Sequence, residues 1–408
     1  MSKKGAAVRI ILAMLLTVLT ITLVLGVGSV IGTVVLIVGV GWIFLSLIKL
    51  LSKKFNVSNH LAYKLNLGVT SVLLAWLIAE LILRYGIATY SNYSEKNGGL
   101  FYISPYLVKE SSWSSVWRSG EHVYKPNYKA FFNFKEHSYQ LVTNSDGFRD
   151  KEYNSEHGLE KYIVFVLGDS FTEGKGVAMD LSWPQLLAKE LSAAELQRKC
   201  YVINAGISGS DPIFELSLLE KSVEKYNPDI VIVAINKSDI DDIIVRGGLD
   251  RYDMDGVLNY ADSPWWIGFY ANSFLVRHFA HDVLDYNWLL IKENEMEQRE
   301  KKAMDQMLLT LEKFESFANS KQFELLFVFH PTLEEMQGGR LELEPMITKM
   351  KASSNSLILN LLDYFNEHKQ QNSPEDFYWP IDRHHNEKGY RLFAKGVKNY
   401  MISSDLIN

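Results

Sequence analysis

The sequence has little cysteine and no strong excess of charge. Cys200 is the only cysteine among 408 residues, so no disulfide can form within the chain and the fold cannot depend on oxidation. The 42 basic and 48 acidic residues leave a formal net charge of -6, which gives no indication of a nucleic-acid partner. No internal repeat or low-complexity tract is evident. What stands out is a long apolar region at the N-terminus.

The apolar residues of this region predict a membrane anchor. From Ile10 to Leu51 the only charged residue is Lys49, and this length is about twice the ~20 residues with which a helix crosses a bilayer. The small residues of GVGSVIG, at positions 26–32, divide the stretch, and a third apolar stretch follows. We therefore expect residues 1–84 to form three transmembrane helices, at about 10–27, 30–50 and 66–84. A buried helical hairpin in a soluble protein is the alternative.

The positive charges predict how this anchor is oriented, because Lys and Arg are enriched in cytoplasmic loops. They form two groups: Lys3, Lys4 and Arg9, and Lys49, Lys53, Lys54 and Lys64. With both groups in the cytoplasm, three spans place the chain after about Arg84 on the extracytoplasmic side of a cytoplasmic (inner) membrane, with the lipid bilayer as a partner. Glu80 lies one turn from the end of the third span. We expect it to reach the interface or pair with another helix, and a functional intramembrane acid is the alternative.

The remaining chain divides into an extension at 85–150 and an α/β domain at 151–408. Continuous apolar segments alternate with amphipathic ones, which is typical of a parallel sheet covered by helices on both faces. A segment rich in Trp, Tyr and His, at 250–290, is a long insertion. The expected strands are 162–168, 200–206, 229–235, 323–330 and 357–362, and the expected helices are 183–197, 212–226, 295–320, 342–352 and 387–401.

The first strand runs into Gly168-Asp169-Ser170 and a glycine-rich turn. A phosphate-binding loop needs four residues between its first glycine and Gly-Lys, followed by Ser or Thr. Here five residues separate Gly168 from Gly174, and Gly176 follows Lys175, so the spacing is wrong. Ligands of open parallel sheets bind at the carboxyl ends of the strands, where Ser170 is placed. The turn therefore favours a serine nucleophile.

A serine nucleophile needs a base and an orienting acid, and the loop before the last expected helix supplies both types. This loop contains Asp382, His384 and His385. A carboxylate two or three positions before an imidazole can bond Nδ1 while Nε2 faces the serine. Surface or helix-capping histidines are the alternative. We expect no metal site, because no third ligand stands at a telling spacing, and no cofactor.

Together these segments resemble the SGNH (GDSL-type) esterase and acyltransferase superfamily. VLGDSFTEGKGV is similar to its first block, NAGISGSDP to its second and DRHHNEKGY to its last, while VIVAINKSDIDD occupies the place of the third. The resemblance covers about 140–402. It implies a flavodoxin-like three-layer α/β/α domain, with Ser170 as the nucleophile and Asp382 with a histidine completing a triad. The backbone N–H groups of Ser170 and Gly206 would stabilise the oxyanion.

Two departures from the family pattern leave alternatives open. The third block usually reads Gly-x-Asn-Asp, with asparagine as a further oxyanion donor, whereas this chain has Ser238-Asp239 there. Ser238 is then the donor, or Asn236 two residues earlier. The family's Asp-x-x-His spacing selects His385 as the base, but the following Asn386 and Gly389 fit His384. We favour His384.

The function implied is a membrane-anchored serine esterase or O-acyltransferase that acts outside the membrane. Its expected partners are an acylated cell-envelope polymer or a small acyl ester, and a membrane acyl-transfer partner in the transferase case. The alternative from another class is a non-catalytic scaffold or glycan-binding protein with a degenerate SGNH domain, which the altered third block supports. A secreted phospholipase-like enzyme would leave the anchor unexplained.

Overall fold

The computed structural model describes residues 30–83, 123–153, 161–194, 198–251, 264–287, 289–353, 356–369 and 372–407. The chain forms two compact units. The first comprises Met1–Ser114 and Asp262–Met296, and the second comprises Ser115–Ala261 and Glu297–Asn408. The expected insertion is therefore divided between them, with most of it in the first unit.

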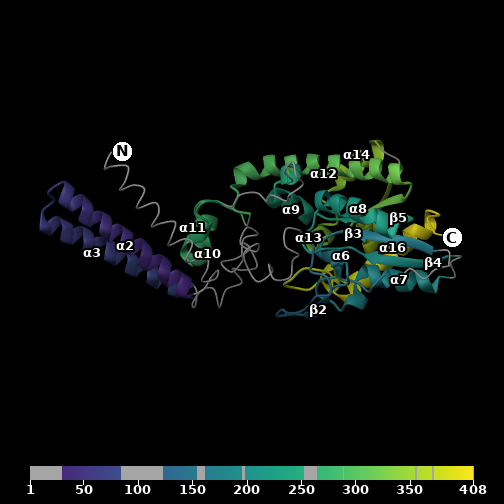
Figure 1. The fold of residues 1–408 in the computed structure, drawn as a ribbon, viewed down its shortest axis with the longest axis horizontal. Helices are drawn as coiled ribbons and strands as arrows, with labels where there is room; N and C mark the ends of the chain where they lie inside the picture. Colours follow the sequence, from purple (N-terminus) through teal and green to yellow (C-terminus); the bar gives the residue numbers. More distant parts are fainter. Residues whose placement is uncertain are drawn as a thin grey trace. The chain divides into compact units, whose positions relative to one another are not determined.

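The first unit contains two long apolar helices, α2 (Val30–Lys54) and α3 (Asn59–Leu81). Both are long and apolar enough to cross a membrane, over Gly32–Lys54 and Asn59–Leu81. Helix α3 begins earlier than the sequence predicted, because Ser58 caps it: the Ser58 hydroxyl accepts the Leu61 N–H at 3.3 Å. The first expected span, at 10–27, lies outside the described residues. Two short helices, α10 (Ile267–Asn272) and α11 (Phe274–Asp282), pack against α2 and α3 (Figure 1).

The second unit is built on a five-stranded parallel sheet, which confirms the predicted fold class. The strand order is β4-β3-β5-β6-β7. All six residues of β5 are buried, as expected for a central strand covered on both faces. The strands are β3 (Lys161–Leu167), β4 (Lys199–Asn204), β5 (Ile230–Ile235), β6 (Glu324–Phe329) and β7 (Leu357–Asn360).

Helices cover both faces of this sheet. In Figure 1, α8 and α12 lie above the strands and α7 lies below them. Helix α7 packs on α16, where the rings of Trp183 and Phe393 stack at 4.4 Å between centroids. The helices are α6 (Ser170–Glu173), α7 (Trp183–Ala193), α8 (Pro212–Tyr226), α9 (Ser238–Arg246), α12 (Glu293–Lys321), α13 (Leu333–Gly338), α14 (Glu344–Ser353), α15 (Leu361–His368) and α16 (Glu387–Ser403), with short 3-10 turns at η3 (Met179–Leu181), η4 (Gly248–Arg251) and η5 (Pro374–Phe377).

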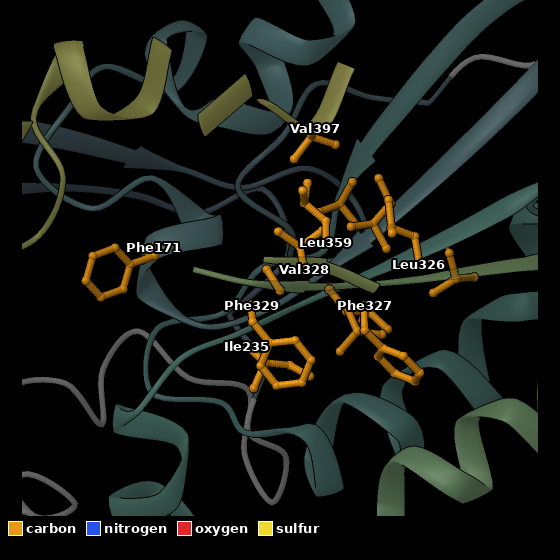
Figure 2. Close-up of a cluster of buried hydrophobic side chains, with 14 of the residues drawn as sticks. Phe171, Ile235, Leu326, Phe327, Val328, Phe329, Leu359 and Val397 are labelled. Atoms are coloured by element: carbon orange, nitrogen blue, oxygen red, sulfur yellow. The ribbon is translucent and has the colours of Figure 1, made fainter. Parts of the chain in front are cut away.

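The side chains of β6 show how the sheet is buried on two sides. Leu326 and Val328 point toward Leu359 and Val397, whereas Phe327 and Phe329 point to the opposite face (Figure 2). Successive side chains of a strand alternate between faces, so a strand with apolar residues at every position needs cover on both. All five β6 residues after Glu324 are buried.

The described part of the extension forms a hairpin that precedes the sheet. Strand β1 (Lys129–Asn133) pairs antiparallel with β2 (Ser138–Val142). Arg149, which is fully buried, joins this hairpin to the turn after α6. Its guanidinium donates to the carbonyls of Gln140 at 3.2 Å, Gly174 at 2.7 Å and Val177 at 2.7 Å.

The strand order locates the site. Strand β3 has β4 on one side and β5 on the other, so the order reverses at β3. In open α/β sheets the crevice at such a reversal, outside the carboxyl ends of the strands, is the usual ligand site. The loops that leave β3 and β5 there carry Ser170 and Asn236.

Candidate active site

Ser170 is the first residue of α6, directly past the carboxyl end of β3. The chain turns at Gly168, whose φ is +150°; a Cβ there would lie 2.2 Å from Thr172 Oγ1, so only glycine fits. Asp169 then caps α6, because its carboxylate accepts the Phe171 N–H at 2.8 Å. This cap and turn hold the Ser170 side chain at the rim of the sheet, where the residue is 9% exposed.

The structure brings Ser170, His384 and Asp382 together. Ser170 Oγ lies 2.7 Å from His384 Nε2, and Asp382 Oδ1 accepts a hydrogen bond from His384 Nδ1. The Phe171 ring stacks on the imidazole, with 4.6 Å between centroids. This is the geometry in which an imidazole can take the proton of a serine hydroxyl.

The charges around the pair fix their protonation states. Burial alone would raise the pKa of Asp382, but its hydrogen bond to His384 and the charges of His384 and Lys175 lower that pKa far below its usual range. Burial lowers the pKa of His384, and the charge of Lys175 lowers it further, while Asp382 opposes both. At neutral pH the imidazole is therefore neutral and ready to accept a proton, and the carboxylate is ionised.

His385 points away from this group. It is fully buried, its ring packs on those of Tyr378 and Phe365 at 4.4 and 5.4 Å, and burial lowers its pKa well below the usual value. The reason is local: His385 forms an antiparallel bridge with Tyr378. In extended backbone, neighbouring side chains face opposite ways, so one histidine of the pair faces Ser170 and the other faces the core.

The second oxygen of Asp382 is held by residues that the sequence did not reveal as part of the site. Lys175 Nζ lies 3.1 Å from Asp382 Oδ2, and His137 Nε2 lies 3.5 Å from the same atom. The Glu136 carboxylate accepts the backbone N–H of Ile381 at 2.8 and 2.9 Å and that of Asp382 at 2.8 Å. Glu136 and His137 belong to the turn between β1 and β2, so the hairpin binds the loop that carries Asp382.

Gly206 has a different role from the expected oxyanion donor. Its N–H already donates to Asn204 Oδ1 at 3.0 Å, so it is not free for a substrate. A Cβ at this position would lie 2.4 Å from the backbone nitrogen of Glu173. Gly206 is therefore a close-packing position that lets the loop after β4 approach α6.

Asn236 and Ser238 are also turned toward each other and toward Asp169. The Asn236 amide donates to Asp169 Oδ2 at 3.0 Å and lies 3.3 Å from His330 Nε2. The Ser238 hydroxyl donates to Asn236 Oδ1 at 2.7 Å. Burial lowers the pKa of His330 to about 4, so this histidine is a neutral member of the network. Both side chains are thus committed to positioning the loop around Asp169.

Two other backbone N–H groups, in α6 and in the loop after β4, have no hydrogen-bond acceptor within the described parts of the chain. They are those of Ser170 and Gly209. Gly209, at a φ of +70°, follows Ser208, whose N–H bonds Glu173 of α6 at 2.9 Å. The signal in the sequence was a second glycine, Gly209, three positions after Gly206 in the same loop.

No group of three or more His, Cys, Asp or Glu residues in the described ranges is placed to hold a metal ion.

Comparison with known proteins identifies the family. The model of the GDSL-like lipase/acylhydrolase family matches residues 164–397, more than half of the chain. The chain belongs to this family. The matched range contains Ser170, Asp382 and His384 and begins after the β1–β2 hairpin, so Glu136 and His137 lie outside it.

One curated relative and two solved structures illustrate the similarity to individual proteins. A Vibrio mimicus arylesterase is 33% identical over 76 residues, which is 19% of this chain and 37% of that protein. A two-domain esterase active on acetylated mannans shares 15% identity, with a TM-score of 0.37 over 60% of this chain and 50% of that one. An acetylxylan esterase from Geobacillus stearothermophilus shares 15% identity, with a TM-score of 0.36 over 59% of this chain and 94% of that one.

Proposed function

We propose that this GDSL-like protein is a membrane-anchored serine esterase or O-acyltransferase that uses Ser170, His384 and Asp382. The observation that carries the proposal is the 2.7 Å contact between Ser170 Oγ and His384 Nε2, with Asp382 on the other imidazole nitrogen. Membership of an esterase and acylhydrolase family supports the reaction class.

The reaction proceeds through an acyl-enzyme. Ser170 Oγ attacks the acyl carbon as its proton passes to His384 Nε2, and the charge that develops on the carbonyl oxygen is stabilised by backbone N–H donors. The imidazolium, held by Asp382, then gives its proton to the departing alcohol. Water or a sugar hydroxyl then attacks the acyl-enzyme as its proton passes to His384. As the bond between the acyl carbon and Ser170 Oγ breaks, His384 returns this proton to Oγ, which restores the hydroxyl and the neutral imidazole. Water gives hydrolysis and a sugar hydroxyl gives acyl transfer.

We assign the oxyanion donors to the N–H groups of Ser170 and Gly209. Gly206, Asn236 and Ser238 already use their donors elsewhere, whereas these two N–H groups have no acceptor in the described parts of the chain. A site without an asparagine donor is consistent with slow turnover, since loss of one such donor costs ~10²–10³-fold in kcat.

The proposed location is supported by helices α2 and α3, which are long and apolar enough to cross a membrane, and by the lysines near the turn between them. Lys49, Lys53, Lys54 and Lys64 flank the turn that joins them. With this turn in the cytoplasm, α2 begins and α3 ends on the opposite side, so the hydrolase unit is extracytoplasmic. An acylated glycan of the cell envelope is the substrate class that this location offers.

A fluorophosphonate probe tests the nucleophile in the full-length protein in detergent. Wild type and Ser192→Ala, a control on the exposed face of α7, are expected to be labelled, and Ser170→Ala is not. Release of acetate from an acetylated glycan should follow the same pattern. Labelling that persists in Ser170→Ala would refute the assignment, and its absence from wild type would favour the non-catalytic scaffold.

A further inference from the structure

Glu80, the acidic residue of α3, joins this helix to the segment at 264–287. Glu80 is 1% exposed, and its carboxylate accepts the N–H groups of Phe274 at 2.9 Å and Leu275 at 3.1 Å. It also accepts hydrogen bonds from the Ser273 hydroxyl and from the Trp76 indole at 3.2 Å. Ser273 is the N-cap of α11, and Phe274 and Leu275 are its first two residues. A carboxylate at this helix end is stabilised by the unpaired N–H groups and the helix dipole. Glu80 is thus a paired, structural acid.

The same segment is attached to α2. The Thr33 hydroxyl donates to the backbone oxygen of Asn272, the last residue of α10. Thr33 lies in the first turn of α2 and Glu80 in the last turn of α3. Helices α10 and α11 therefore sit on one end of the α2–α3 hairpin, opposite the lysine-rich turn (Figure 1).

Helix geometry places this end at the membrane boundary. Thr33 and Lys53 are 20 positions apart in α2, as are His60 and Glu80 in α3. At ~1.5 Å per residue each pair is separated by ~30 Å, the thickness of the hydrocarbon core. If the lysine-rich turn lies in the cytoplasmic headgroups, Thr33 and Glu80 reach the opposite headgroup layer. The segment bound to them lies at the same depth.

The surface of the segment suits such a layer. Four of its apolar side chains are exposed: Trp265 at 82%, Val283 at 53%, Phe279 at 51% and Leu284 at 44%. Polar groups stand among them, including the His278–Asp282 pair at 2.7 Å. Aromatic side chains with polar neighbours are enriched where acyl chains meet headgroups.

We propose that residues 264–287 form an interfacial element that lies in the outer headgroup region, with Trp265, Phe279, Val283 and Leu284 in contact with lipid. The inference rests on the membrane anchoring of the proposed function. Its consequence concerns the hydrolase unit, since the chain passes between the two units three times, at 114–115, 261–262 and 296–297. The hydrolase unit is then connected to the membrane surface by the segment inserted between its two parts, as well as at its N-terminal side.

Spin labels at single cysteines test this in the full-length protein. Because Cys200 is the only native cysteine, a Cys200→Ser background accepts one label at a time. The test positions are Trp265→Cys and Phe279→Cys. The lipid control is Val72→Cys, 67% exposed on α3, and the aqueous control is Leu309→Cys, 44% exposed on α12 in the hydrolase unit. The protein is reconstituted into vesicles of phosphatidylethanolamine and phosphatidylglycerol, and collision rates with oxygen and with a water-soluble nickel chelate are compared.

The expected oxygen-to-nickel ratio is highest at Val72→Cys, lowest at Leu309→Cys and several-fold above the Leu309 value at both test positions. Test positions that match Leu309→Cys while Val72→Cys stays in lipid would overturn the interfacial element and leave the anchor intact. A Val72→Cys ratio equal to that of Leu309→Cys would overturn the anchor, and the interfacial element with it.

Discussion

Replacing Glu136 with alanine is expected to impair the reaction although its carboxylate bonds the backbone of the loop that carries Asp382 and not Ser170 or His384. Its carboxylate is the acceptor for the backbone N–H groups of Ile381 and Asp382, at 2.8–2.9 Å. Asp382 in turn orients His384. Removal of the carboxylate frees the loop to move the acid away from the imidazole, so Glu136 acts as a positioning residue.

The size of the effect follows from these contacts. Hydrogen bonds to a charged group contribute ~1.5–3 kcal/mol each when well formed, and the half-buried location of Glu136 places their combined contribution near the value for a single such bond. A loss of ~1.4–2.7 kcal/mol lowers the population of the productive loop, and thus kcat, ~10–100-fold. KM is expected to change little.

The assay is hydrolysis of p-nitrophenyl acetate by the full-length protein, together with thermal unfolding. Glu136→Gln keeps an acceptor oxygen and should retain intermediate activity, and Lys135→Ala, on the exposed neighbour, should match wild type. The pH profile of the residual activity separates positioning from general damage, because a displaced Asp382 changes the pH at which His384 loses its proton. Wild-type kcat in Glu136→Ala would refute the reasoning, as would equal losses in Glu136→Ala and Lys135→Ala.

Other predictions concern the imidazoles and the core. Burial and the Lys175 charge lower the pKa of His384, and activity disappears as pH falls through that pKa; Lys175→Met should move the acid limb of kcat/KM to higher pH, whereas Lys175→Arg should leave it in place. His385→Phe should keep most of the activity, since this ring lies among aromatic side chains, and His384→Phe should abolish it; the reverse pattern would contradict the assignment. Trp183→Ala removes a fully buried ring stacked on Phe393 and should reduce the free energy of unfolding by ~3–5 kcal/mol, measured by urea denaturation.

Much of the hydrolase fold was predictable from the sequence. Unbroken apolar runs and the helical period of amphipathic segments are both local patterns. They predicted the parallel sheet and the helix at Pro212–Tyr226 with its bounds. Four short helices, α6, α9, α13 and α15, were missed. Each has nine residues or fewer, which is too short for the spacing of its apolar residues to distinguish a helix from a loop.

The sequence alone determined that Ser170 follows a buried strand and that Asp382 and two histidines precede the last helix. Only the tertiary structure decided which histidine meets the serine, because that depends on the bridge between His385 and Tyr378. It also decided that Asn236 and Ser238 serve Asp169, and that Glu136 holds a loop 245 positions away. Which side chains become partners depends on the packing of segments that are distant in the sequence, and this packing cannot be predicted from a local pattern of residues.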